Sequence, residues 1–312
     1  MARPRNNLKD FLAFVVVRLF VMFVHMFGWE TNYRAAAWLG NLLYRFDRRH
    51  RNRAVEHIRL SFPDWPEDKV RRVAMASMRN LMYLGLEVLF TTRLICPGRW
   101  RKHVKLGNMM AETTRLLVER KSGVVMATPH FGNWEVVGYT MATLGFPVVA
   151  VARPLDNPYF NEYVMGVREK TGMSILYKKG ATQSMDDVIA SRGVIGFIPD
   201  QDAGRKGVFV DFFGRKASTY KSVALMAIRH NVPLMVGYGQ RLDEEYHFEM
   251  GMQRIIYPHE WADKPDPLLW VTQEWTTAME QIVRRAPEQY LWVHRRWKHR
   301  PNGEQPGPDG IA

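Results

Sequence analysis

A histidine and a glutamate five residues apart offer the clearest chemistry in this chain of 312 residues. His130 follows a short apolar run, Val124–Met126, that predicts a buried strand, and Glu135 stands where a predicted helix, Val136–Leu144, begins. Histidine can accept a proton at neutral pH, and a nearby carboxylate can fix its tautomer and stabilise its cation. On one continuous helix these two side chains would not share a face, but the turn Phe131–Asn133 lets the chain double back. We therefore predict an acid/base site at a strand-to-helix junction.

The elements that would position this site alternate between apolar runs and helical patterns. Buried strands are predicted at Val124–Met126, Val148–Ala152, Ile175–Tyr177, Val194–Pro199 and Leu234–Tyr238. Helices are predicted at Val136–Leu144, Tyr159–Lys170, Ala181–Ser191 and Tyr220–His230, with a late amphipathic helix from Leu268 to Ile282. This alternation predicts an α/β fold with a largely parallel sheet flanked by helices. His130, Arg153 and Asp200 each follow a predicted strand, and sites in such folds gather at the carboxyl ends of strands.

The N-terminal region is predicted to be helical and to attach to a membrane. An apolar run from Phe11 to Phe27 follows a basic start, and as a helix it would be roughly 26 Å long, against about 30 Å for a bilayer core. Arg18 opposes insertion, so a tilted span and a helix lying in the interface both stay open. A cleavable signal peptide and a buried core helix are alternatives. We assign residues 1–30 to an anchor helix, 31–300 to the main domain and 301–312 to a disordered tail.

The charge of the chain limits its partners. The formal net charge is +13, which predicts attraction to polyanions such as nucleic acid, anionic lipid or an acidic protein. Six arginines gather between residues 45 and 59, where they suit anionic headgroups beside an anchor. No nucleic-acid-binding motif accompanies them, so we expect no nucleic-acid partner. The single cysteine, Cys96, excludes an internal disulfide, and no zinc-binding spacing is present, so we expect no metal and no cofactor.

The string His130-Phe131-Gly132-Asn133-Trp134-Glu135 resembles the lipid A biosynthesis (late) acyltransferase family, which is part of the glycerolipid acyltransferase superfamily. Further segments agree with that family in the expected order. They are Arg53–Pro63, Arg153–Pro158, Asp200-Gln201, Val208–Gly214 with Thr219, and Gln289–Lys298. The resemblance covers the chain from about residue 10 to residue 300 and is specific for the family, not for the acceptor.

The resemblance implies a membrane-associated acyltransferase at the cytoplasmic face of a bacterial inner membrane. It implies acyl carrier protein as the donor of the fatty acyl group and a phosphorylated lipid A precursor as the acceptor. The basic surface suits both partners, because such carriers are acidic and the acceptor carries phosphates. No Gly-x-Ser-x-Gly nucleophile motif is present, which favours direct transfer over an acyl-enzyme.

The resemblance also suggests roles for individual residues. His130 would be the general base that deprotonates the acceptor hydroxyl, and Glu135 would orient His130. Arg153 could bind a phosphate, stabilise the oxyanion or pair structurally with Asp200. The remaining candidates for substrate binding are Asn133, Asp200, Gln201, Arg295, Arg296 and Lys298, of which Asn133 could equally be a turn residue and the three cations a solvated surface.

Three rival functions remain open at this stage. The same chemistry could act on another lipid, such as a mannosylated phosphoinositide, with acyl-coenzyme A as donor. A non-catalytic membrane-binding or nucleic-acid-binding protein would use the basic surface alone. A thioester hydrolase would replace the acceptor hydroxyl with water and would need no site for a lipid acceptor.

Overall fold

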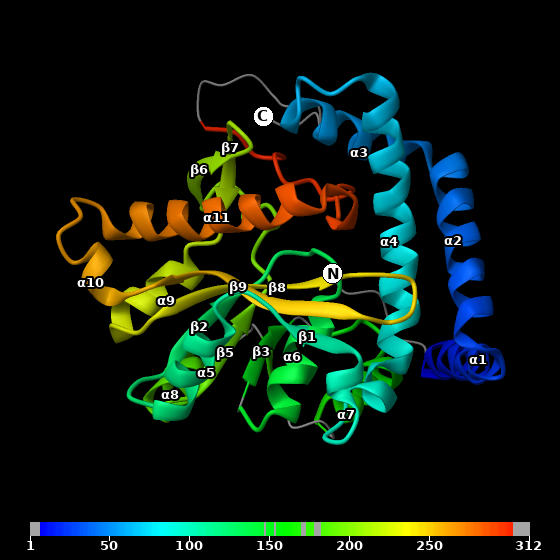
Figure 1. The fold of residues 1–312 in the computed structure, drawn as a ribbon, viewed down its shortest axis with the longest axis horizontal. Helices are drawn as coiled ribbons and strands as arrows, with labels where there is room; N and C mark the ends of the chain where they lie inside the picture. The colour runs from blue at the N-terminus through cyan, green and yellow to red at the C-terminus, as the bar shows by residue number, and fades with distance from the viewer. Residues whose placement is uncertain (1–6, 147, 153, 170–172, 178–181, 302–312) are drawn as a thin grey trace.

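The computed structural model describes residues 7–146, 148–152, 154–169, 173–177 and 182–301. Its centre is a seven-stranded sheet with the strand order β1-β9-β8-β2-β5-β3-β4 (Figure 1). In that order the strands are Val104–Leu106, Phe248–Ile256, Leu234–Arg241, Val124–Ala127, Val194–Phe197, Val148–Ala152 and Ser174–Tyr177. Within this sheet β8 and β9 pair antiparallel, and the other pairs are parallel. The predicted α/β fold with a largely parallel sheet is confirmed.

Strand β2 shows how the sheet is buried on both faces. Val125 and Ala127 belong to one hydrophobic core, and Val124 and Met126 belong to the other, because successive side chains of a strand point to opposite faces. Helices α8, α9 and α11 contribute to the first core, and α5 and α6 to the second, so α11 and α6 lie on opposite sides of β8 (Figure 1). These helices are Thr182–Ala190, Ser222–His230, Pro267–Arg285, Met110–Glu119 and Trp134–Thr143.

Three helices before the sheet form the predicted helical region: α2 (Trp29–Phe46), α3 (Arg48–Ser61) and α4 (Glu67–Leu94). The 28-residue helix α4 packs against α2 and α3 and reaches α6 in the main domain (Figure 1). Among the described helices, α4 alone is long and apolar enough to cross a membrane, but 44% of its most apolar window is buried inside the protein. Its packing makes α4 a core helix that carries side chains toward the site.

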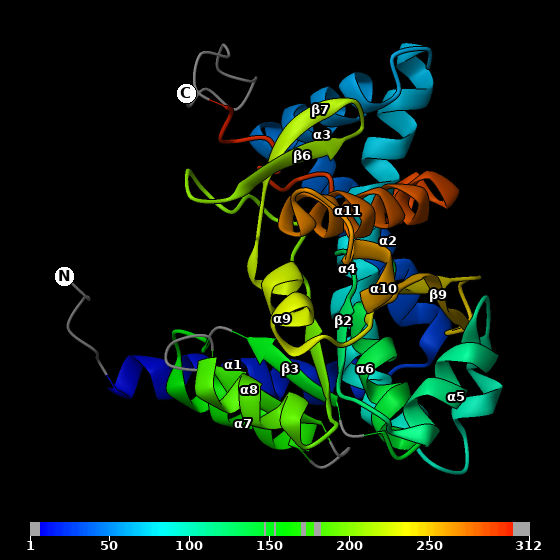
Figure 2. The same cartoon turned by 90° about the vertical axis from the view of Figure 1, so that its left-hand side faces the viewer.

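The first helix, α1 (Asn7–His25), covers most of the predicted apolar run and packs against α7 (Pro158–Glu169). Figure 2 shows α1 lying alongside α7 at the edge of the domain. Phe14 contacts the rings of Tyr159, Phe160 and Tyr163 at centroid distances of 6.1–6.4 Å. One face of α1 is therefore occupied by protein.

Several elements were not anticipated from the sequence. Strands β1 and β9 extend the sheet beyond β8, and β6 (Val208–Phe212) with β7 (Arg215–Thr219) forms a separate antiparallel hairpin. Short helices occur at Trp100–Lys102, Pro258–Trp261 and Pro287–Gln289. Strand β9 was missed because its sequence, FEMGMQRII, mixes charged residues and glycine with apolar ones, and such a run resembles a loop as much as a strand. The predicted tail lies almost wholly outside the described residues.

Candidate active site

The turn that carries the histidine is held against the edge of β8 by its backbone. Gly132 has a φ of +54°, and a Cβ atom there would lie 2.0 Å from the carbonyl oxygen of Gly239. Its N–H donates to the carbonyl oxygen of Gln289 at 3.0 Å, and the N–H of Asn133 donates to that of Gly239 at 2.8 Å. Only glycine fits this position, because both the φ angle and the close approach exclude a side chain.

A buried polar network supports the same turn from below. The carboxylate of Glu87 on α4 is fully buried and pairs with the guanidinium of Arg241 at the end of β8. Glu87 also accepts a hydrogen bond from Asn133 Nδ2 at 2.9 Å, and Arg241 donates to Asn80. The side-chain amide of Gln289 both accepts from the backbone N–H of Arg241 and donates to its carbonyl oxygen, each at 2.9 Å. The network joins α4, β8 and the 289–298 segment beneath the turn.

The carboxylate that contacts His130 is that of Asp200, which follows strand β5. It accepts a hydrogen bond from the backbone N–H of His130 at 2.8 Å and a second from ring atom Nδ1 at 2.5 Å. The Asp200 side chain is 2% exposed and that of His130 is 15% exposed. A carboxylate is only an acceptor, so Nδ1 carries the proton and Nε2 is the ring nitrogen that can take one up. The two residues form a buried, oriented base.

Glu135, which was predicted to orient His130, is paired elsewhere. Its carboxylate accepts a hydrogen bond from Arg168 of α7, and both side chains are largely buried. Residue 135 is in the first turn of α6, and that helix directs its side chain toward α7. The prediction that Glu135 orients His130 is therefore corrected: a carboxylate distant in sequence takes this position, which the spacing within one motif could not reveal.

The electrostatics of the site keep Asp200 charged. Burial alone would raise the pKa of Asp200, but the positive charge of His130 and its hydrogen bonds hold that pKa well below its usual range. A second imidazole, His294, lies edge-on to His130 with ring centroids 4.6 Å apart. Burial, and then the positive charge of His130, lowers the pKa of His294 to about 3. His294 is thus a neutral neighbour of the proposed base.

The remaining predicted residues have different surroundings. Asn133 is fully buried, and its Oδ1 caps α6 by accepting from the N–H of Val136 at 3.1 Å, which fits the alternative that it is a turn residue. Arg296 is 1% exposed and donates to the carbonyl oxygen of Ser218 and to Thr219 Oγ1, both at 2.6 Å, so the prediction that it binds an acceptor phosphate is also corrected.

Gln201, in contrast, is exposed beside the base, and its side-chain amide contacts His294 Nε2 at 3.1 Å. Arg295 and Lys298 are partly exposed on the segment that follows His294, so their assignment to substrate binding stays a prediction. Arg153 lies outside the described residues. Among the described residues, a possible cation site is the group His130, Asp200 and His294, whose potential ligand atoms lie within 4.8 Å of one another. Our expectation of no metal stays a prediction.

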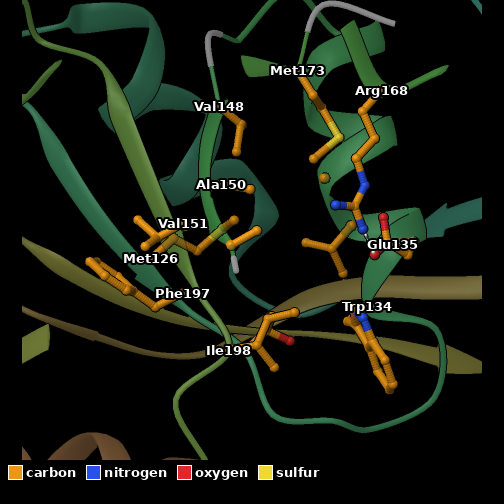
Figure 3. Close-up of a pocket in the computed structure, with 15 residues that line it drawn as sticks. Met126, Trp134, Glu135, Val148, Ala150, Val151, Arg168, Met173, Phe197 and Ile198 are labelled. Atoms are coloured by element: carbon orange, nitrogen blue, oxygen red, sulfur yellow. Dashed lines mark hydrogen bonds and ion pairs between the residues drawn. The ribbon is translucent and has the colours of Figure 1, made fainter. Parts of the chain in front are cut away.

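A pocket lined mainly by apolar side chains adjoins the site. Its labelled residues are shown in Figure 3, where Trp134 and Ile198 lie at one end and Met173 and Val148 at the other. Trp134 also contacts His130 edge-on, with centroids 4.8 Å apart. The pocket therefore extends from Trp134, the neighbour of His130, into the space between β3, β5 and α6.

Sequence reasoning missed the residues that act across long sequence separations. Glu87 carried the best available signal, because it is a lone carboxylate inside the apolar stretch Leu81–Phe90 of a predicted helix. A charge in such a stretch is seldom buried without a partner. No local pattern pointed to Arg241 or Arg168, whose partners lie 154 and 33 residues away.

Comparisons with known proteins find relatives that match most of the chain. The model of the bacterial lipid A biosynthesis acyltransferase family matches residues 3–299. A lipid A biosynthesis lauroyltransferase of Escherichia coli K12 is 27% identical over 276 residues, covering 87% of this chain and 86% of the relative. A lipid A biosynthesis palmitoleoyltransferase of the same organism is 26% identical and covers 85% and 84%. A phosphatidylinositol mannoside acyltransferase of Mycolicibacterium smegmatis is 30% identical over 116 residues, which are 36% of this chain and 38% of the relative.

Proposed function

The chain belongs to the bacterial lipid A biosynthesis acyltransferase family and is an acyltransferase, and we propose that it moves a fatty acyl group from an acyl carrier protein thioester to a hydroxyl group of a phosphorylated lipid A precursor. The observation that carries this proposal is the His130–Asp200 pair beside the apolar pocket. The pair supplies a base, and the pocket supplies an apolar site for a hydrocarbon chain.

The proposed step is direct transfer. Nε2 of His130 takes the proton of the acceptor hydroxyl while that oxygen attacks the carbonyl carbon of the thioester. The tetrahedral intermediate collapses with cleavage of the carbon–sulfur bond, the ester forms, and the imidazolium returns its proton to the leaving thiolate. Asp200 holds the Nδ1 proton and stabilises the imidazolium through its negative charge.

The surroundings of the pair suit these substrates. The pocket is lined mainly by apolar side chains, so an acyl chain placed there would bring its thioester carbonyl toward Trp134 and His130. The formal charge of +13 favours an acidic carrier and a phosphorylated acceptor. We keep Gln201, Arg295 and Lys298 as candidates for acceptor contacts because they are exposed or partly exposed near His294.

We further propose that the enzyme attaches to the cytoplasmic face of a bacterial inner membrane through α1. The face of α1 that does not pack on α7 exposes large apolar side chains, among them Val16, Leu19, Phe20, Met22 and Phe23, each at least 55% exposed. Arg18 lies over the ring of Tyr163 at 4.4 Å, so its charge is held toward the protein. A helix with one face on the protein and one apolar face outward favours a position in the membrane interface over a full span.

The test is acyl transfer in detergent from labelled acyl carrier protein to a tetra-acylated, diphosphorylated lipid A precursor. A product heavier by one acyl group is the expected result, and acyl-coenzyme A is run in parallel to compare donors. A mannosylated phosphoinositide acceptor tests the rival suggested by the partial match to mannoside acyltransferases. Transfer to that lipid alone, or release of free fatty acid with no lipid product, would overturn the proposal.

A further inference from the structure

Two glycines face the apolar pocket at positions where the backbone does not require glycine. Gly138 is in the interior of α6 and Gly196 is in strand β5, and both line the pocket. Neither has a positive φ angle. Glycine weakens a helix or a strand relative to alanine, because it loses more conformational freedom on folding. The reason for glycine at these two positions therefore lies in the space that a side chain would fill.

The space at each glycine differs. A Cβ atom at Gly196 would have its nearest neighbours at 3.7 Å, the Cε of Met126 and a Cγ of Val148, which is ordinary van der Waals contact. A Cβ atom at Gly138 would lie 2.7 Å from the Cε and 3.1 Å from the Sδ of Met173. That neighbour is the flexible end of a methionine, which can move. A small side chain at either position would take up pocket space without clashing with backbone, because the backbone atom nearest to a Cβ at Gly196 is the carbonyl oxygen of Val149, 3.9 Å away.

Met173 lies at the end of the pocket that is remote from His130. Trp134, at the other end, contacts His130, whereas Met173 and Val148 lie together at the far end (Figure 3). Met173 is 5% exposed, so its side chain is buried at this end of the pocket. A hydrocarbon chain whose carbonyl is near His130 would therefore direct its methyl end toward Met173 and pass Gly138 and Gly196.

We propose that Gly138, Gly196 and Met173 together set the length of the acyl chain that the enzyme transfers. This inference rests on the proposed function, because it takes the pocket as the site of the donor's acyl chain. The two glycines keep the inner part of the pocket open, and Met173 ends it. Longer chains are rejected because their last methylenes have no space beyond the methionine.

The direction of each substitution follows from this geometry. Gly138→Ala and Gly196→Val remove space and should shift the preferred chain to a shorter one. Met173→Ala opens the end and should shift the preference to a longer one. Each methylene that gains or loses its place should change the relative rate for that chain by about 10–200-fold.

The experiment offers the wild type and each variant an equimolar mixture of acyl carrier proteins charged with saturated chains from octanoyl to octadecanoyl. Mass spectrometry then records which chains reach the lipid A precursor, and native mass spectrometry records which acyl carrier proteins remain bound without acceptor. Gly85→Ala is the matched control, because Gly85 is an exposed position within α4 where an added methyl group would have no neighbouring atom within 4 Å, and it does not line the pocket.

The expected result is a shift to shorter chains in both glycine variants, a shift to longer chains in Met173→Ala, and the wild-type profile in Gly85→Ala. An unchanged profile in all three pocket variants, each folded by circular dichroism, would overturn the assignment and leave the proposed function intact. If the wild type transfers no acyl group but bound chain lengths shift as stated, the proposed function fails and the pocket assignment holds.

Discussion

Replacing Asp200 by asparagine should be far more damaging than replacing Glu135 by glutamine. The Asp200 carboxylate accepts from both the backbone N–H and the Nδ1–H of His130. Asparagine has the same shape but a single acceptor oxygen. If that oxygen accepts from the backbone N–H, the amide nitrogen must donate to Nδ1, and the ring proton moves to Nε2. The nitrogen that should take the proton of the acceptor hydroxyl is then already protonated.

The size of the effect follows from that tautomer change. The equivalent aspartate-to-asparagine change in a serine protease triad lowers kcat by about 10⁴-fold, or about 5.5 kcal/mol in the activation free energy. We expect a loss of about this size in Asp200→Asn. Glu135→Gln keeps a side chain that can still accept a hydrogen bond from Arg168, and residue 135 does not contact His130. We therefore expect kcat to fall by about tenfold or less, which corresponds to the roughly 0.5–1.5 kcal/mol that one hydrogen bond contributes.

The assay is kcat for acyl transfer at saturating donor and acceptor, with thermal unfolding of each variant to confirm that it is folded. A rival interpretation, in which Glu135 orients His130, predicts the reverse order. Loss of activity in Glu135→Gln as large as in Asp200→Asn, or an Asp200→Asn variant within tenfold of the wild type, would refute the reasoning from the structure.

Three further predictions concern stability, pH and membrane attachment. Glu87→Ala leaves the guanidinium of Arg241 buried without its counter-ion, and should lower the free energy of unfolding by about 3–5 kcal/mol in urea denaturation. His294 stays neutral in the folded protein, where its pKa is about 3, whereas an unfolded histidine takes up a proton near pH 6.5. The unfolded state then binds more protons, so stability should fall as the pH drops from about 6.5 toward 3, less steeply in His294→Asn. Phe20→Asp should weaken sedimentation with anionic phospholipid vesicles, because Phe20 is 55% exposed on the outer face of α1.

Each of these has a control and an opposing result. Glu30→Ala removes an exposed partner of Arg34 on a helix surface and should lower the free energy of unfolding by less than about 1 kcal/mol. If Glu87→Ala lowered the free energy of unfolding by no more than Glu30→Ala, the stabilising role of the buried network would be contradicted. Identical slopes of stability against pH in wild type and His294→Asn would show that His294 does not titrate as described. If Phe20→Asp bound the vesicles as well as the wild type, the outer face of α1 would not be the surface that attaches the protein to the membrane.

The sheet and the place of the base could be predicted from the sequence because their signals are local. The apolar runs at Val124–Met126 and Val148–Ala152 are strands β2 and β3, and the glycine turn after β2 does present His130 at a carboxyl end. The position of Asp200 after another strand was visible as well, since parallel strands bring their carboxyl ends to one edge. What the sequence could not supply was which carboxylate turns toward the histidine.

The errors share one physical cause, which is partner choice across the fold. Glu135 is close to His130 along the chain, but α6 directs its side chain toward Arg168, with which it forms a hydrogen bond. The carboxylate that contacts His130 belongs to Asp200, which is 70 residues away in the sequence. An arginine such as Arg296 can bind phosphate, but here its guanidinium is buried and donates a hydrogen bond to the carbonyl oxygen of Ser218 in the β6–β7 hairpin. The type of a side chain predicts which groups it can bind, whereas the tertiary fold determines which groups lie next to it.

The central claim is that His130 is the base of an acyl transfer to a lipid A precursor. The most direct measurement is the initial rate of that transfer by the wild type and by His130→Gln, which can still hydrogen-bond to Asp200 and so limits structural damage. Loss of a general base should lower the rate by about 10²–10⁴-fold, with donor binding retained. A His130→Gln variant that forms the acylated product at the wild-type rate would contradict the account.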